Sequence, residues 1–594
     1  MMGFLHWIRD IVVGMLNGVV KFALFVVAFF LVIAAIGAMQ GDGLPANMVL
    51  GLDLRSAMQD SAPPSPFNIG GRPLTVMDVV LGLDAAGRDA RVKGVYMRVG
   101  GGDLSVAQAE EIGAALQRFR ATGKFVIAHS QGFLSAGIGD YLTAANADQI
   151  WMQPKSPFGA AGSGAGAIFL RGLFDKIQAE PQMVKRSDYK SFADMYMEKD
   201  YTAPDREQVT ALLTSFYNDG TAAVAADRKI DQKAVQSTFD ASPQSAETAM
   251  RAGLIDKTGY DDDAYAAALA RAGDNAKGEN FSTFARAADE REHFDHSGDI
   301  ALIEASGDIV DGTAGGGGMF GGSTNIAGDD LSRAIRNATK DKTIKAILLR
   351  VDSPGGSVTA SDQILDAVKK AQSAGKPVVI SMGSVAASGG YYISCAAAKI
   401  VAEPATITGS IGVVTGKLSF GKSLNLIGVN ADQIGVGKNA LIDSAITPFT
   451  PEQLAAVNAQ ADEIYADFMQ KVAAGRKLPL EQVQTIAKGR VWSGTDAKSH
   501  GLVDELGGFW TAAADAAKLA GDPAGARIVF RLYPQKKGFF EALGSMLGSS
   551  SASLRAMQGM VTLFNSPAAQ VLENAVSTAP RGDVQMRATN LPGH

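Results

Sequence analysis

One serine stands where a hydroxyl could do chemistry. Ser388 lies in the sequence AASGG (386–390), between a predicted strand at 377–382 and a predicted helix that runs toward residue 398. A serine at this junction sits on a sharp backbone turn, and the N–H groups at the helix start can face developing negative charge. Beside glycines, however, a lone serine is most often a helix cap. A catalytic role therefore requires a second, matching loop.

Such a loop follows another predicted strand. Residues 352–357 read DSPGGS, and two adjacent glycines allow backbone N–H groups to approach a substrate closely. Together the two loops can form an oxyanion hole for acyl transfer. We assign its donors to the N–H of Gly389 and to one N–H of the glycine pair, with Gly356 preferred and Gly355 kept as the alternative.

A serine nucleophile also needs a base. Among the six histidines only His129 approaches a strand-end motif, and a structural role suits it better. The AASGG sequence also differs from the GxSxG elbow whose serine pairs with histidine. A lysine is the remaining route. Its pKa must fall by about 3 units from ~10.4, about 4 kcal/mol, which requires burial away from water.

Composition excludes several other functions. A net charge of -6 and a pI near 5.7 provide no basic surface for phosphates, so we expect no nucleic-acid partner. Cys395 is the only cysteine, which excludes an intrachain disulfide, a cysteine metal cluster and a CxxC pair. We predict no metal and no cofactor. Cys395 itself should pack as a small apolar side chain, not act as a rival nucleophile.

The chain contains a long internal repeat. Both copies show a strand that ends at an arginine, a turn with glycine, a helix and a second strand. The matched segments are 92–99 (VKGVYMRV) with 344–351 (IKAILLRV), 107–122 with 360–374, 123–127 with 375–380, and 249–256 (AMRAGLID) with 497–504 (AKSHGLVD). Buried β-rich runs that alternate with helices predict two tandem α/β repeats with mostly parallel sheets, with functional loops at the strand C-termini.

Comparison of the two copies indicates which of them keeps the candidate nucleophile. Aligning 383–392 with 132–141 places Gly137 opposite Ser388, so the first copy lacks the hydroxyl. We therefore expect the nucleophile in the second copy only.

The domain boundaries follow from the repeat and from composition. We predict a short stub and membrane anchor at 1–45, a first α/β repeat at 46–295, a second at 296–535, and a helical tail at 536–594. Within the second repeat, the glycine tract 315–322 should form a mobile loop. In the tail, 539–547 could offer an apolar helical surface.

Near the N-terminus, residues 22–39 form an uncharged apolar run long enough to span a bilayer as a helix. Arg9 and Lys21 precede it, and Asp42 is the first charge after it, which favours an N-in orientation with the bulk of the chain outside the cytoplasm. A cleaved signal peptide is the alternative, because 35–37 (AIG) resembles a cleavage site. The length and depth of the run favour an anchor.

Three motifs occur in order: SPGGSV (353–358), ASGGYY (387–392) and TGSIGV (408–413). Ordered and duplicated in this way, they resemble the long form of the signal peptide peptidase A family, peptidase family S49, with a Clp/crotonase-like fold. The resemblance implies a serine/lysine dyad. The family's Tyr-Lys-Ser segment of the first copy matches Lys190, and Lys438 in the second copy is a fallback slightly out of register. Ser410 matches the position whose hydroxyl orients the lysine.

The same resemblance implies the biology. We expect a membrane-anchored serine endopeptidase that degrades released signal peptides and other apolar peptides near the membrane. It further implies a homotetramer, contact with membrane lipid through the anchor, and catalytic domains on the periplasmic side of the bacterial inner membrane. Two alternatives remain. A crotonase-like acyl-CoA enzyme would use the same oxyanion hole without needing Ser388 or Lys190, and a catalytically inactive membrane scaffold would need only the fold.

Overall fold

The structure is a computed structural model that describes residues 43–61, 73–101, 104–133, 137–295, 297–313, 325–534 and 585–587. The predicted anchor, the glycine tract 315–322 and the apolar tail segment 539–547 lie outside these residues. Within the described ranges, no helix is both long and apolar enough to cross a membrane.

The first repeat is built on a fully parallel sheet, whose described strands follow the order β8-β4-β3-β2-β1-β9. Its central strands are apolar and buried, as expected for a sheet covered on both faces. The strands are β1 (Met48–Asp53), β2 (Val92–Val99), β3 (Phe125–Ser130), β4 (Gln149–Met152), β8 (Lys257–Thr258) and β9 (Lys277–Asn280). A short antiparallel pair joins β5 (Pro157–Phe158) to β7 (Gln244–Ser245).

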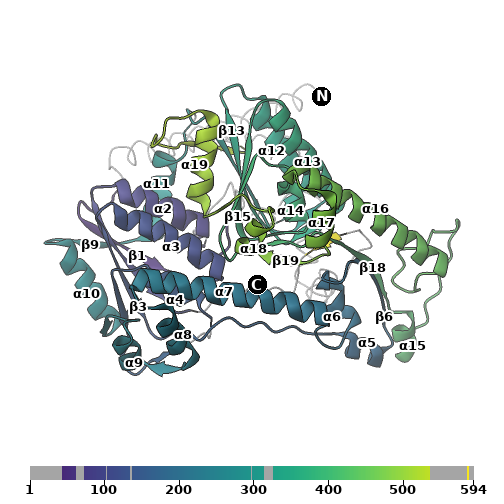
Figure 1. Cartoon of the computed structure of the whole chain (residues 1–594), viewed down its shortest axis with the longest axis horizontal. Coiled ribbons are helices and arrows are strands. Elements are labelled where there is room, and N and C mark those ends of the chain that lie inside the picture. Colours follow the sequence, from purple (N-terminus) through teal and green to yellow (C-terminus); the bar gives the residue numbers. More distant parts are fainter. Residues whose placement is uncertain are drawn as a thin grey trace, which may run out of the picture.

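The helices of this repeat lie around the sheet, except α5 and α6, which lie away from it toward the opposite end of the molecule (Figure 1). The helices are α2 (Val76–Arg88), α3 (Val106–Ala121), α4 (Gly139–Ala145), α5 (Arg171–Ile177), α6 (Asp194–Met197), α7 (Ala203–Arg228), α8 (Gln232–Asp240), α9 (Ala246–Arg251), α10 (Asp261–Ala272) and α11 (Phe281–Glu292). A short 3-10 helix, Ser191–Ala193, precedes α6.

The second repeat has the same plan. Its described strands run in the order β20-β16-β15-β13-β10-β21, and β17 pairs with β15 and antiparallel with β19. The strands are β10 (Ile300–Ser306), β13 (Ala346–Ser353), β15 (Val378–Ala387), β16 (Lys399–Ala402), β17 (Ile407–Gly409), β19 (Val491–Ser493), β20 (Glu505–Leu506) and β21 (Phe530–Tyr533). The helices are α12 (Gly328–Lys340), α13 (Val358–Ser373), α14 (Gly389–Ser394), α15 (Gly421–Leu426), α16 (Pro451–Arg476), α17 (Leu480–Ile486), α18 (Gly494–Ser499) and α19 (Phe509–Ala520).

The two long helices show how closely the copies match. Both α7 and α16 have 26 residues, and each begins after a threonine that caps it, Thr202 or Thr450, with a proline at one of the first two positions. Each ends at a lysine in the left-handed conformation. The predicted pair of α/β repeats with mostly parallel sheets is confirmed.

A third sheet joins the repeats. Strand β6 (Glu180–Arg186) belongs to the first repeat, yet all seven of its residues pair antiparallel with β18 (Val413–Ser419) of the second. The order of the described strands is β12-β11-β14-β22-β18-β6, with β11 (Ile309–Val310), β12 (Ile326–Ala327), β14 (Gly355–Ser357) and β22 (Gln585–Arg587). Because β6 ends four residues before Lys190, this pairing carries that lysine to the second repeat.

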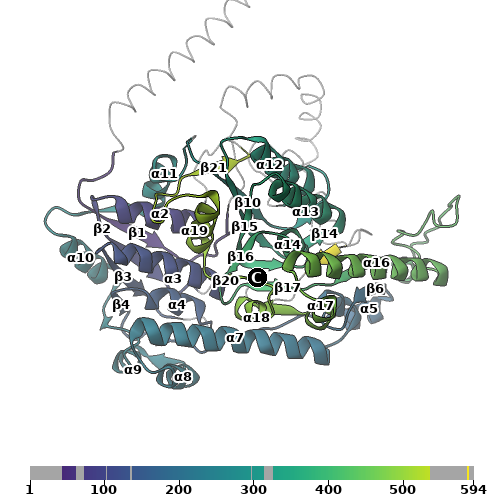
Figure 2. The ribbon, with the colours of Figure 1, turned by 45° about the horizontal axis from the view of Figure 1, so that its top comes forward.

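The repeats also share a hydrophobic core. Buried side chains of α19, among them Phe509 and Trp510, belong to the same cluster as the first repeat's strands and helix α2. The indole N–H of Trp510 donates to the Val80 carbonyl in α2, at 3.4 Å. Helix α19 lies between the two halves in Figure 2. This core fixes the position of one repeat relative to the other.

Candidate active site

Ser388 occupies the tight junction between β15 and α14. Its backbone has φ 56° and ψ -114°, a conformation that side chains with a Cβ rarely adopt and that requires support from the surrounding structure. That support is visible: its N–H donates to the Gly409 carbonyl at 2.9 Å, and its carbonyl accepts the Tyr392 N–H at 2.8 Å. The residue is fully buried. Its hydroxyl is therefore held in one place.

Lys190 meets this hydroxyl from the other repeat. Its Nζ lies 2.8 Å from Ser388 Oγ, 2.9 Å from Ser410 Oγ and 3.0 Å from the Ser410 carbonyl oxygen. All three residues are buried. A neutral amine has two hydrogens and one lone pair. Ser410 can accept both hydrogens, which directs the lone pair at the hydroxyl of Ser388.

The surroundings of Lys190 favour this neutral form. Burial lowers the pKa of the Lys190 amine from 10.5 to about 7, because the ammonium form loses its hydration. A substantial fraction of the amine is then unprotonated at neutral pH, as a general base must be.

A turn of the second repeat packs against the backbone at Lys190. Gly489, at φ +74°, packs so closely that a Cβ there would lie 2.6 Å from the Lys190 Cβ. The Tyr189 N–H donates to the Lys488 carbonyl at 3.1 Å, and the Ser410 N–H donates to the Arg490 carbonyl at 2.7 Å. The turn at 488–490 thus contacts both Lys190 and Ser410 and fixes their backbones relative to each other. The sequence reasoning missed it, although the Lys-Gly-Arg triplet is a visible turn signal.

The two glycine loops lie against each other. A Cβ built on Gly389 would stand 3.1 Å from the Gly356 nitrogen and 3.1 Å from the Gly355 Cα. Only a residue without a side chain allows this approach. The Gly355 N–H already donates to Ser353 Oγ at 3.2 Å. The structure therefore brings together all the residues predicted for the oxyanion hole.

The other residues considered lie elsewhere or are inert. Lys438 is exposed on the loop between α15 and α16. His129 is buried in the first sheet, where its ring contacts the Gly259 carbonyl at 3.2 Å and Asp261 at 3.4 Å. Cys395 is buried, and burial raises the pKa of its thiol to about 12, so it stays protonated. Within the described residues, no group of three or more His, Cys, Asp or Glu side chains could hold a metal ion.

One alignment drawn from the sequence was wrong by a residue. Tyr141 and Tyr391 donate to equivalent carbonyls, at Leu254 and Leu502, and the helices after the two turns begin at Gly139 and Gly389. The bridge from Gly137 to Gly162 likewise matches that from Ala387 to Gly409. Ile138, not Gly137, is therefore the counterpart of Ser388. The first repeat still lacks the hydroxyl.

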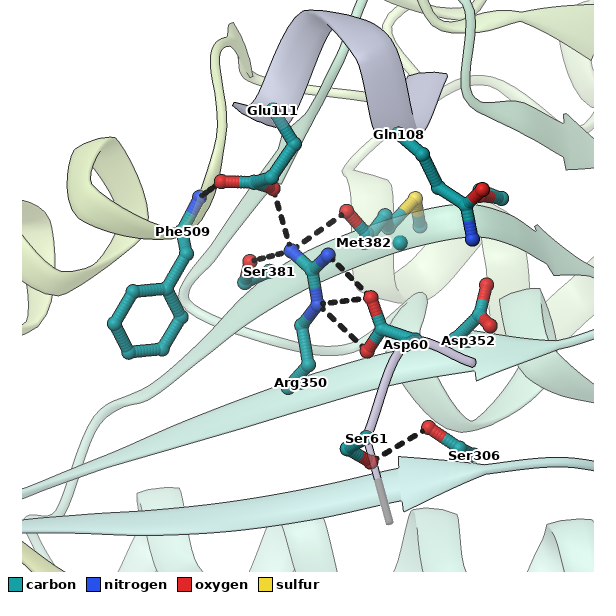
Figure 3. Close-up of polar contacts among 12 residues, drawn as sticks. Asp60, Ser61, Gln108, Glu111, Ser306, Arg350, Asp352, Ser381, Met382 and Phe509 are labelled. Carbon is teal, nitrogen blue, oxygen red and sulfur yellow. Dashed lines mark hydrogen bonds and ion pairs between the residues drawn. The ribbon is translucent and has the colours of Figure 1, made fainter. Parts of the chain in front are cut away.

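A buried ionic network holds the repeats together behind the site (Figure 3). The Arg350 guanidinium contacts Asp60 at 2.6 Å and Glu111 at 2.9 Å, and all three are almost wholly buried. Arg350 belongs to the second repeat and both acids to the first. The matching arginine, Arg98, is 31% exposed and pairs with Asp261 at 3.1 Å. Both repeats have an arginine at this strand end. In the described structure, only Arg350 forms ion pairs with the other repeat.

Asp352 connects this network to the two glycine loops. It stands two residues after Arg350 on β13, just before the 353–357 turn, and accepts the Val385 N–H of β15 at 3.0 Å. Burial, followed by the nearby Asp60 charge, raises the pKa of Asp352 to about 7. Asp352 therefore links β13, which leads into the 353–357 turn, to β15, which leads into Ser388.

Comparison with known proteins places this site in a class. A Clp protease family model matches residues 329–407, which include β13, the 353–357 turn and Ser388. A buried serine beside paired glycine loops on such a fold defines a serine peptidase with a Clp-like fold. The Peptidase family S49 model matches twice, at 118–274 and 370–522, once in each repeat.

Similar curated proteins cover most of the chain. It is 30% identical over 536 residues to Protease 4 of Haemophilus influenzae, covering 84% of this chain and 85% of that one. It is 31% identical to Protease 4 of Salmonella typhi, with 87% and 86% covered. It is also 31% identical to the chloroplastic serine protease SPPA of Arabidopsis thaliana, with 86% and 75% covered. The chain belongs to peptidase family S49 and is a serine protease, which confirms the resemblance seen in the sequence.

Proposed function

We propose that this protease is a membrane-anchored endopeptidase in which Ser388 attacks the peptide bond and Lys190 is the general base. The observation that carries the proposal is the 2.8 Å contact between Lys190 Nζ and Ser388 Oγ, inside a buried site, between side chains of different repeats. The crotonase-like alternative gives no reason for this contact. An inactive scaffold gives no reason for the complete site around it.

The geometry supports acyl transfer to Ser388, with Lys190 carrying the proton. The Lys190 lone pair takes the Ser388 proton as Oγ bonds to the substrate carbonyl carbon, and the new oxyanion faces the N–H groups of Gly389 and Gly356. Gly355 is the weaker donor because its N–H is engaged by Ser353. The Lys190 ammonium then protonates the leaving amine as the C–N bond breaks. Water hydrolyses the acyl-enzyme by the reverse proton path, with Ser410 orienting the amine throughout.

Substrates are proposed to be released signal peptides and other apolar peptides in extended form. Strand β22 supports this: it lies between β14 and β18, with Gly356 opposite Met586 and Val414 opposite Gln585. A position with a strand on each side suits an extended peptide, whose main chain can bond to both neighbours. The apolar segment 22–39 would keep the site at the periplasmic face of the inner membrane, where such peptides are released. A homotetramer, implied by the family resemblance, completes the proposal.

Hydrolysis of casein and of one synthetic apolar peptide tests the proposal, with wild type, Ser388→Ala and Lys190→Ala compared in mild detergent. We expect cleavage by wild type only. A fluorophosphonate probe should label Ser388 in wild type, which an acyl-CoA enzyme would not require. Cleavage by Ser388→Ala would refute the assignment of the nucleophile.

A further inference from the structure

Strand β15 changes its neighbour partway along its length. Residues 379–381 pair with β16, and residues 385–387 pair with β17. Ser388 continues the second pairing, because its N–H donates to the carbonyl of Gly409, the last residue of β17, at 2.9 Å. The change of neighbour therefore brings the candidate nucleophile to the strand that ends beside Ser410.

This change of neighbour takes place at a bulge. On the other side of β15, the pairing with β13 is in register up to Val351, but Ser353 then lies opposite Ala386. One residue of β13, Asp352, therefore faces three residues of β15, which are 383–385. We call these three residues the β15 bulge. Bulges are frequent beside active sites, where they bend a strand and re-aim a side chain.

The side chain of Asp352 contacts the β15 bulge at two points. Its carboxyl group accepts the N–H of Val385 at 3.0 Å. It also packs against Gly383, where an added Cβ would lie 2.8 Å from Asp352 Oδ1 and 2.9 Å from the Asp352 Cβ. Gly383 does not have a positive φ, so its backbone conformation does not require glycine. The close approach of Asp352 is therefore the reason for a glycine at this position.

Two further hydrogen bonds hold the bulge from other elements. Thr406 Oγ1 donates to the Gly383 carbonyl at 2.8 Å, and the hydroxyl oxygens of Ser384 and Ser105 lie 2.9 Å apart. Ser105 belongs to the first repeat, where it caps α3. Neither of these bonds involves the Val385 N–H. Asp352 therefore makes a backbone contact that the other two do not duplicate.

The first repeat has no counterpart of this carboxyl group. The sequence match between the repeats places Gly100 opposite Asp352, and β2 and β3 stay in register to their last residues. A Cβ on Gly100 would lie 2.4 Å from Ser130 Oγ, which accepts the Gly132 N–H at 3.1 Å. The first repeat thus holds this turn with a serine of the same strand. The repeat that carries Ser388 uses an aspartate of the neighbouring strand.

We propose that Asp352 is a positioning residue for the reaction. Its carboxyl group fixes the β15 bulge, and the bulge sets Ser388 at the distance from the Lys190 amine that proton transfer needs. Asp352 acts through β15 and takes no part in the proton transfer. A displacement of about 1 Å in a reacting group can cost on the order of 100-fold in rate. This inference rests on the proposed function, because it takes Ser388 as the nucleophile.

A purely ionic role for Asp352 would have a different consequence. The residue also lies beside the Arg350 network (Figure 3). Arg350 already contacts two carboxylates, those of Asp60 and Glu111, so its charge does not require a third. The hydrogen bond from Val385, in contrast, needs an oxygen acceptor and no charge. An asparagine amide supplies that oxygen, so Asp352→Asn distinguishes the two roles.

The rate of Ser388 acylation by a fluorophosphonate, per mole of folded protein, tests the inference. Asp352→Ala should lower this rate by about 10- to 100-fold, whereas Asp352→Asn should stay close to wild type. With an apolar peptide, the loss in Asp352→Ala should appear in kcat, with KM nearly unchanged. Asp366→Ala removes an exposed carboxylate of α13 and is the matched control, in which both constants should match wild type.

Gly383→Ala provides a second test, because its methyl group would displace the Asp352 carboxyl group without removing it. It should also slow acylation, which keeps the inference testable if Asp352→Ala does not fold. A wild-type rate in folded Asp352→Ala or Gly383→Ala, or equal losses in Asp352→Ala and Asp352→Asn, would overturn the inference and leave the proposed function intact. Absence of labelling at Ser388 in the wild-type protein would refute the proposed function, and this inference with it.

Discussion

The turn at Ser388 and the turn at Ile138 occupy equivalent places in two copies of one fold. Each follows a sheet strand, precedes a short helix and stands beside a glycine-serine pair, Gly409-Ser410 or Gly162-Ser163. Only the first holds a hydroxyl, and in the described part of the chain only the first is contacted by a lysine. The fold thus provides the position twice, whereas the proposed chemistry needs two side chains that come from opposite repeats.

Removing the hydroxyl should have the largest effect. Ser388→Ala should lower turnover of an apolar peptide by at least about 10³-fold, because it removes the hydroxyl that Lys190 would activate. The change of an exposed serine, Ser499→Ala, is the matched control and should have no effect. The rate of peptide cleavage per mole of folded protein is the measurement. Comparable turnover in Ser388→Ala and wild type would contradict the difference between the two turns.

The strand-end arginines offer the next comparison. Arg350→Met leaves Asp60 and Glu111 buried without a counter-ion and should lower the free energy of unfolding by about 3–5 kcal/mol. The same change at the partly exposed Arg98 should cost at most about 1 kcal/mol. Denaturant unfolding followed by circular dichroism measures both. Equal losses at the two positions would show that the inter-repeat network has no special role.

Ser410, after Gly409, and Ser163, after Gly162, should show a smaller difference in their effect on turnover. Ser410→Ala removes one acceptor of the Lys190 amine, so turnover should fall by about 10- to 100-fold while KM changes little. The corresponding change at Ser163 should have a much smaller effect, because Ser163 does not contact Lys190. Steady-state kinetics on one peptide gives both values. A drop confined to KM would argue against an orienting role for Ser410.

Much of this arrangement could be predicted from the sequence. The repeated strand-turn-helix pattern indicated the parallel α/β sheets, and the two glycine loops predicted that Gly389 and the pair Gly355-Gly356 lie together, as they do. The choice of Lys190 came from family resemblance, since a lysine bears no local mark of burial. Strand β6, paired with the opposite repeat, explains why: its contacts lie more than 220 residues away in the chain.

The ionic network between the repeats was not predicted for the same reason, because its contacts join distant parts of the chain. Asp60 and Arg350 are 290 residues apart, and no periodicity links them. Glu111 looks like an ordinary polar residue of helix α3, yet it is buried against Arg350. The alignment error at Ile138 arose because a gapless match of Tyr141 with Tyr392 fits the sequence as well as the correct match with Tyr391. Only the carbonyls that these tyrosines bind distinguish the two.

The most direct test of the account is the pH dependence of Ser388 acylation by a fluorophosphonate, with the labelled residue identified by mass spectrometry. Burial lowers the pKa of Lys190 to about 7, and the base acts only when unprotonated. The rate in wild type should therefore rise with pH through a midpoint near 7 and level off above it. Lys190→Ala and Lys190→Arg should show almost no labelling, the latter because a guanidinium keeps its proton. Labelling of Ser388 at the wild-type rate in Lys190→Arg, with the same midpoint, would contradict the dyad.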